Sequence, residues 1–226
     1  MTTYAVRVWL PDRPGALGAV ASRIGAVRGD LVGIEILERG GGRAIDELLV
    51  QLPGDDLLPL LVAEISQVDG VDVEDVRLAA ESVHNPRLGG LEAAAVLVEQ
   101  YALDGLFTAL CAHARHTFDA DWSVLLDLDG PGLLASAGEA PPATWLGAFL
   151  HGSRTSAAVV GADAGPDDVA WAELPTADLA LVLGRQGRPF RAQERRQLLA
   201  LARIADSRRI ELVARQALAT QPGAAR

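Results

Sequence analysis

The stretch with the clearest binding chemistry is the corner Asp12-Arg13-Pro14-Gly15, between a β-type segment and an apolar helical segment. Pro14 fixes its own φ and stiffens the corner. Gly15 has no Cβ, so a ligand or a second chain can approach the backbone closely. The first amides of the following helix face outward at the positive end of the helix dipole, where they can bind a carboxylate. The corner therefore predicts a binding site for a small carboxylate.

Other candidate chemical groups are few. His113 and His116 lie three residues apart on one predicted helix face, with Asp119 and Asp121 nearby; a metal site and a solvated helix end are both open interpretations, and the second is favoured because imidazoles complement that end of the helix dipole. Cys111, the single cysteine, reads as a small buried side chain in an apolar helix rather than as a nucleophile. Since the sequence has no lysine, it has no P-loop. We therefore predict no catalytic residue, no metal site and no cofactor.

Composition narrows the classes of partner. The 226-residue chain is half apolar and carries a net charge of −10, which argues against nucleic acid or an anionic membrane as the default partner. Residues 185–215 differ, with nine arginines against three acids; this segment is either a solvated helix face or a basic face for an acidic protein partner. We find no secretory signal and no stretch long enough to span a membrane. We expect a soluble, cytoplasmic protein.

The first eighty residues show a regular alternation of strand and helix patterns. The expected order is β-α-β-β-α-β, which predicts a four-stranded antiparallel sheet with both helices on one face. The strands are predicted at 4–10, 31–38, 44–52 and 71–78, and the helices at 17–27 and from Asp55 or Asp56 to about Val68.

The second face of this sheet carries no predicted helix. Ile34, Ile36, Ile45 or Leu49 on that face would form a large apolar patch. The simplest cover is a second copy of the same domain, so we predict a homodimer through this half of the chain.

Residues 4–79 resemble an ACT domain, a small regulatory module with a ferredoxin-like βαββαβ fold that binds amino acids or related metabolites at dimer interfaces. The resemblance rests on Asp12-Arg13-Pro14-Gly15-Ala16-Leu17, followed by an apolar helix and a glycine before the second strand. It implies a ligand between this loop and the second strand of the neighbouring subunit, with Asp12 binding an α-amino group. The implied binding residues are Asp12, Arg13, Gly15, Ala16 and Leu17, with Gly33, Ile34 and Glu35 opposite.

The sequence also departs from the family pattern. Amino-acid-binding members often have Asn in the loop and near the start of the second strand, whereas this chain has Asp12 and Leu31. Two hypotheses therefore stay open. Either the corner binds a ligand, or Asp12 only caps the helix and Gly15 only permits dimer packing.

The rest of the chain predicts a second domain at 91–219, after a polar linker at 81–90. The pattern of helix, antiparallel strands, short helix, strands and terminal helix, above all residues 179–205, resembles a GAF-like α/β/α sensor domain with an antiparallel sheet. The expected helices are 91–116 with a break at Gly105, 142–151 and 193–219; the expected strands are 122–127, 133–136, 169–174 and 177–184, with a loop at 161–168. Together with the ACT-like domain at 1–80, this gives an α+β chain.

The combined prediction is a non-catalytic regulatory protein. It binds an amino acid or related metabolite at an ACT-like dimer interface and relays the signal to the GAF-like domain, with an unidentified regulatory protein as a further partner. The alternatives are an enzyme with its catalytic site in 84–226, and a ligand-free module that assembles other proteins.

Overall fold

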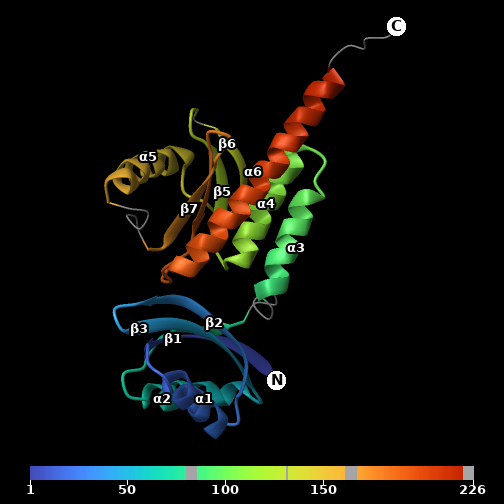
Figure 1. The fold of residues 1–226 in the computed structure, drawn as a ribbon. Helices are drawn as coiled ribbons and strands as arrows, with labels where there is room; N and C mark the ends of the chain where they lie inside the picture. The colour runs from blue at the N-terminus through green and yellow to red at the C-terminus, as the bar shows by residue number, and fades with distance from the viewer. Residues whose placement is uncertain (80–85, 131, 161–166, 221–226) are drawn as a thin grey trace. The chain divides into compact units, whose positions relative to one another are not determined.

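The computed structural model describes residues 1–79, 86–130, 132–160 and 167–220, and these form an α+β protein with two antiparallel four-stranded sheets. The chain divides into two compact units, formed mainly by Met1–Pro86 and by the residues from Arg87 onward. Each sheet belongs to one unit (Figure 1). In the described part of the chain, no helix has an apolar run long enough to cross a bilayer.

The first unit has its elements in the order expected from the sequence. Its sheet has the strand order β2-β3-β1-β4, and each pair of neighbours is antiparallel. The elements are β1 (Thr2–Pro11), α1 (Ala16–Ala26), β2 (Asp30–Gly40), β3 (Arg43–Leu52), a 3-10 turn (Asp55–Leu57), α2 (Leu58–Ser66) and β4 (Asp72–Leu78).

Period-two alternation in β1 and β3 builds the core of this unit. Val6 and Leu48 are paired across the two strands and are both fully buried. They pack with Val20 and Ile24 of α1 and with Ile65 of α2. Both helices therefore lie on one face of the sheet, as Figure 1 shows.

The opposite face of this sheet is ionic as well as apolar, which corrects the expectation of a bare apolar patch. The Nη2 atom of Arg7 lies 2.9 Å from Oε2 of Glu47, and Arg77 Nη2 lies 3.0 Å from Oε1 of the same carboxylate. Burial alone would raise the pKa of Glu47, but the two guanidiniums together hold it below its usual range. Charge on this face is thus compensated within the chain.

The register of β2 also differs from the expected one. Ile34 is paired with Leu48 and Ile36 with Asp46, so both isoleucines lie on the helix side of the sheet rather than beside Ile45 and Leu49. The cause is a register shift between Leu31 and Gly33, because one extra residue moves every later side chain to the other face. Since β2 is an edge strand, Ile34 and Ile36 remain half exposed.

The second unit has three layers. Its sheet has the strand order β6-β5-β8-β7, with α4 and α6 on one face and α5 on the other (Figure 1). The elements are α3 (Pro86–Val98), α4 (Leu103–Thr117), β5 (Trp122–Asp127), β6 (Leu133–Gly138), α5 (Ala143–Val160), β7 (Val169–Leu174), β8 (Leu179–Gly184) and α6 (Ala192–Thr220).

Several boundaries differ from the expected ones. Helix α3 begins at Pro86, inside the segment expected to be a linker, and the helical region breaks at residues 99–102 rather than at Gly105. The carbonyl of Gln100 in this break accepts two hydrogen bonds from Arg208, which holds the non-helical turn against α6. Helix α5 extends beyond His151 to Val160. Residues 81–85 of the expected linker and 161–166 of the expected loop lie outside the described residues.

Candidate functional site

The corner between β1 and α1 is open where the sequence predicted close approach. Gly15 has φ +88°, a left-handed conformation that favours glycine, and a Cβ built on it would meet no atom within 4 Å. The backbone N–H of Asp12 donates to the Gly42 carbonyl at 2.9 Å, which ties the corner to the β2–β3 turn. The corner therefore has a defined backbone and free space beside it.

The N-terminus of α1 carries no side-chain cap. Gly15 is the N-cap residue, and the first turn contains no acidic side chain. Within the described part of the chain, the amides of Leu17 and Gly18 have no backbone acceptor, whereas Ala19 donates to Gly15. Because such amides and the helix dipole favour an anion, this end of α1 can accept a carboxylate. Asp12 does not cap the helix. The hypothesis without a ligand therefore keeps only its second part, in which Gly15 permits dimer packing.

The predicted corner residues have different environments. Asp12, Arg13 and Gly15 are exposed, and Leu17 is partly buried. Ala16 is buried in the core, so it can offer a ligand only its backbone.

Gly33, Ile34 and Glu35 do not join the corner within one chain. Gly40, at the end of β2, is paired with Arg43 beside the corner, whereas Gly33 lies seven residues earlier, roughly 20 Å along the strand. Ile34 and Glu35 also lie on opposite faces of the sheet. A Cβ on Gly33 would come within 2.9 Å of Leu49 Cδ1, so packing inside the unit already explains this glycine.

Asp46 is a buried acid near the corner that the sequence analysis missed. It is paired with Val8 of β1 and Ile36 of β2, on the side of the sheet that the helices cover. Only 3% of Asp46 is exposed. Its Oδ1 atom is buried and has no hydrogen-bond partner among the residues that the structure describes. The sequence signal was a charged residue in phase with Ala44 and Leu48 on β3.

Burial and two charged groups act on the pKa of Asp46. Burial raises the pKa of the Asp46 carboxyl, the guanidinium of Arg39 lowers it, and the carboxylate of Asp12 raises it. The net direction of the pKa shift is upward, because burial penalises the charged form and, with the repulsion from Asp12, outweighs the attraction of Arg39. The first unit thus contains a buried carboxylate, one oxygen of which has no hydrogen-bond partner among the described residues.

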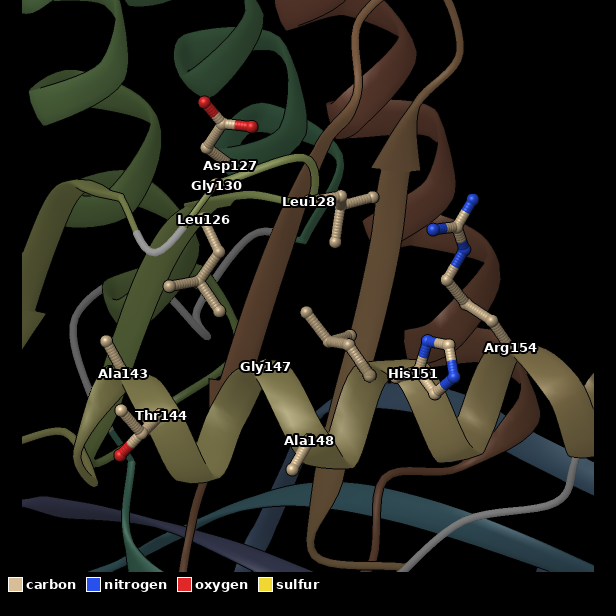
Figure 2. A pocket seen from close by; sticks show the side chains of 11 residues that line it. Leu126, Asp127, Leu128, Gly130, Ala143, Thr144, Gly147, Ala148, His151 and Arg154 are labelled. Carbon is tan, nitrogen blue, oxygen red and sulfur yellow. The ribbon is translucent and has the colours of Figure 1, made fainter.

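The second unit contains a cavity of about 270 Å³ between α5 and the end of β5. Figure 2 shows the side chains that line it. A Cβ on Gly147 would meet no atom within 4 Å, so the small residues of α5 leave this space open. The lining residues are Leu126, Asp127, Leu128, Gly130, Ala143, Thr144, Gly147, Ala148, Leu150, His151 and Arg154.

The cavity lining combines apolar side chains with polar and charged ones. Arg154 Nε lies 2.7 Å from Glu173 Oε1, and Asp127 Oδ1 accepts the backbone N–H of Asp129 at 3.0 Å. The carboxylate of Asp178 raises the pKa of Asp129. A lining of this mixed kind suits a small organic molecule that carries both apolar and polar groups.

The other residues that the sequence offered for chemistry, the acids at 119 and 121 and the single cysteine, take part in interactions within the second unit. Asp121 Oδ2 accepts the Gln186 backbone N–H at 2.8 Å, and Asp119 is paired with Arg188 at 2.9 Å. Among the described residues, no cluster of three or more His, Cys, Asp or Glu side chains could hold a metal ion. Cys111 is buried, and burial raises the pKa of its thiol to about 11. This thiol is protonated at neutral pH.

Many arginines of the basic segment are paired inside the second unit. Arg185 lies 2.7 Å from Glu194, and Arg209 lies 3.1 Å from Asp206. Five of the nine form ion pairs there, and these are Arg185, Arg188, Arg208, Arg209 and Arg215. This pairing favours the structural interpretation of the segment.

Comparisons with known proteins add little to this geometry. No protein-family model matches the chain, and no curated protein matches it. Among solved structures, the chain is similar to an unknown protein from Galdieria sulphuraria, with 18% identity over 44% of this chain and a TM-score of 0.32. The match spans 64% of that protein's length.

Proposed function

We propose that this chain is a cytoplasmic, non-catalytic sensor. An ACT-like first unit binds an amino acid or a related small carboxylate at the corner, as a homodimer, and a GAF-like second unit relays the signal. The observation that carries the proposal is the uncapped start of α1 beside the open space at Gly15. The strand order and the D-R-P-G corner support the family resemblance, but function depends on the site rather than on the fold.

The backbone amides supply the anion-binding part of the site. The amides of Leu17 and Gly18 lie at the positive end of α1 and lack backbone acceptors within the described residues. A ligand carboxylate would satisfy these donors and neutralise the helix end. Exposed Asp12 and Arg13 flank the same opening and would select among ligands by charge.

The proposed dimer rests on the edge of the sheet. Val32, Ile34 and Ile36 are 48%, 48% and 41% exposed along β2, and we call these three residues the β2 strip. An exposed apolar edge strand is a template for pairing with another chain. A second β2 would cover the strip and could bring its Gly33–Glu35 segment near the corner. A ligand bound there would shift the balance between two dimer arrangements according to its affinity for each.

Titration calorimetry against the twenty amino acids tests the ligand part. We expect heat of binding for at least one, and a loss of tenfold or more in affinity in Gly15→Asn, because asparagine tolerates positive φ and would fill the open space. Gly187→Asn is the matched control, since Gly187 has φ +71° and an equally open Cβ position. Silence for all twenty amino acids, together with an unchanged melting temperature, would contradict the proposal.

Light scattering tests the dimer. The wild-type chain should have the mass of a dimer, and Ile34→Glu should shift it towards the monomer, because a charge within the β2 strip opposes association. Leu60→Glu, at an equally exposed apolar residue of α2, is the control. An Ile34→Glu variant that dimerises like wild type would rule out this edge as the interface.

The cavity under α5 supports a small-molecule role for the second unit. Gly147→Leu should fill the cavity and abolish binding of a small molecule to the second unit. The fold should stay intact, because a side chain at this position enters open space. The two alternatives make other predictions. A catalytic second unit would turn over a substrate that enters this cavity, whereas an assembly module would show salt-sensitive association with an acidic partner and no ligand binding.

A further inference from the structure

Helix α3 exposes an apolar face that the described residues leave uncovered. Only two of its thirteen residues are charged. Its buried side belongs to the core cluster of the second unit through Ala93 and Leu97. Leu91 and Val98 lie about two helical turns apart on another side and are 69% and 54% exposed. A helix that is apolar on all sides is normally buried, so this exposed side calls for a cover.

Helix α6 has an exposed face of a similar kind. One side of α6 belongs to the same core cluster as α3, whereas Leu199 and Ile210 on its outer side are 50% and 46% exposed. These two residues are separated by about three helical turns, so they share one face. Arg208 of α6 donates to the Gln100 carbonyl just after α3 at 2.6 Å. The two helices are therefore neighbours in the second unit.

Charged side chains accompany the two apolar faces with opposite sign and equal spacing. Glu92 and Glu99 are exposed beside the apolar pair of α3, and Arg196 and Arg203 are exposed on the outer side of α6. Each pair spans about two helical turns, or roughly 10 Å; the Glu99 amide donates to the Ala95 carbonyl at 3.0 Å, so the helical spacing continues to Glu99. Among the described residues, these four charged groups form no ion pair. We call Leu91, Glu92, Val98 and Glu99 the α3 strip, and Arg196, Leu199, Arg203 and Ile210 the α6 strip.

A second copy of this chain matches both strips at once. In a twofold dimer, the α3 strip of one protomer meets the α6 strip of its partner, and symmetry repeats the same contact in reverse. The apolar side chains then cover one another, and glutamates face arginines. A purely acidic partner protein would suit the α6 strip but would repel the glutamates of the α3 strip. The presence of both signs on one unit therefore favours a second copy.

We propose that the second unit carries a self-association face of its own, in which the α3 strip of one protomer packs against the α6 strip of its partner. This face is separate from the β2 strip of the first unit, so it goes beyond the proposed function. Association through both units couples the arrangement of the two first units to that of the two second units.

Charge reversal followed by mixing tests this face in the full chain by sedimentation equilibrium. Reversal of the α3 strip in Glu92→Arg/Glu99→Arg, or of the α6 strip in Arg196→Glu/Arg203→Glu, should raise the dimer dissociation constant by roughly tenfold or more, because like charges then face one another. An equimolar mixture of the two variants should associate within about threefold of wild type, because every reversed strip then meets a strip of opposite charge.

A matched control reverses two exposed acids that lie outside both strips, in Asp69→Arg/Glu139→Arg. This variant changes the net charge by as much as the reversal of the α3 strip does. It should keep the dissociation constant of wild type, because neither acid belongs to the proposed face. A control that is weakened as much as the reversed strips would assign the effect to net charge and overturn the proposal.

The outcomes separate this face from the dimer edge of the first unit. Wild-type association in both reversed variants, or a mixture as weak as its components, overturns the α3–α6 pairing. Weakening by the α6 reversal alone points to a different acidic partner and also overturns it. If Ile34→Glu weakens the dimer and the strip reversals do not, only the β2 edge stands; the opposite pattern leaves only the face proposed here. A wild-type chain that stays monomeric at every concentration overturns both.

Discussion

Replacing Asp46 with asparagine should stabilise the ligand-free protein. Asparagine keeps the size of the side chain and removes the charge from a position that is 3% exposed. An unsatisfied buried polar group costs about 1–3 kcal/mol, and a charged one costs more. Asparagine is still a buried polar group, so only the charge-specific part of that cost is relieved. We therefore expect the free energy of unfolding to rise by about 1 kcal/mol at neutral pH, which corresponds to about 2–4 °C in melting temperature for a chain of this length.

The pH dependence gives this prediction a sign. Because the folded-state pKa of Asp46 is raised, the folded protein binds the proton more tightly than the unfolded chain does. The residue therefore costs little below the unfolded pKa of about 3.9, and its cost grows as pH rises through the folded pKa. The gain from Asp46→Asn should accordingly be small in acid and reach its maximum above that folded pKa.

Urea unfolding across this pH range, with Asp30→Asn as the control, is the assay. The control should stay within about 0.5 kcal/mol of wild type, as surface substitutions do. A loss of 1 kcal/mol or more in Asp46→Asn, or a gain that shrinks as pH rises, would show that the carboxylate is already stabilised inside the fold.

Three further predictions concern the two cores. Glu47→Gln should lower the free energy of unfolding by about 3 kcal/mol at neutral pH, because it leaves Arg7 and Arg77 without their shared carboxylate. Since the pKa of Glu47 is lowered, this loss should shrink as pH falls through the folded pKa. A pH-independent loss in urea titrations would contradict the ion-pair argument. Gly184→Ala should lower the free energy of unfolding by roughly 1–3 kcal/mol in urea titrations, because its Cβ would overlap the Trp122 ring. A neutral effect would refute that packing. Cys111 should react with a thiol reagent at pH 8 only as fast as the second unit opens, because its thiol is buried and has a pKa of about 11. Reaction at the rate of a free thiol would contradict this burial.

Local sequence patterns were sufficient to predict strand and helix bounds where buried residues recur with a simple period. Strands β5 and β7 have the predicted bounds, because their apolar residues alternate between turn residues. Helix α1 begins at Ala16 after the Pro-Gly corner, close to the predicted start. Helix ends were harder, because the break at residues 99–102 depends on Arg208, which is distant in sequence and donates to the Gln100 carbonyl.

The faces of the edge strand and the buried acid could not be predicted in the same way. One extra residue between Leu31 and Gly33 reverses the facing of Ile34 and Ile36. Gly33 is a sequence signal for a bulge, because glycine inside a strand often marks one, but it does not fix which residue is the extra one. Asp46 was visible as a charge in an apolar phase of β3, but its isolation depends on which groups the fold brings near it. A candidate site whose residues come from several strands therefore could not be predicted without knowing how those strands pair.

The hydrogen bond from the Asp12 amide to the Gly42 carbonyl supplies an internal reporter for the corner. Because this amide exchanges its hydrogen only when the corner separates from the β2–β3 turn, its exchange rate measures how often that separation occurs. A ligand that rigidifies the corner would slow deuterium uptake at the Asp12 amide. Mass spectrometry of the peptide around residue 12 could thus follow occupancy without a label.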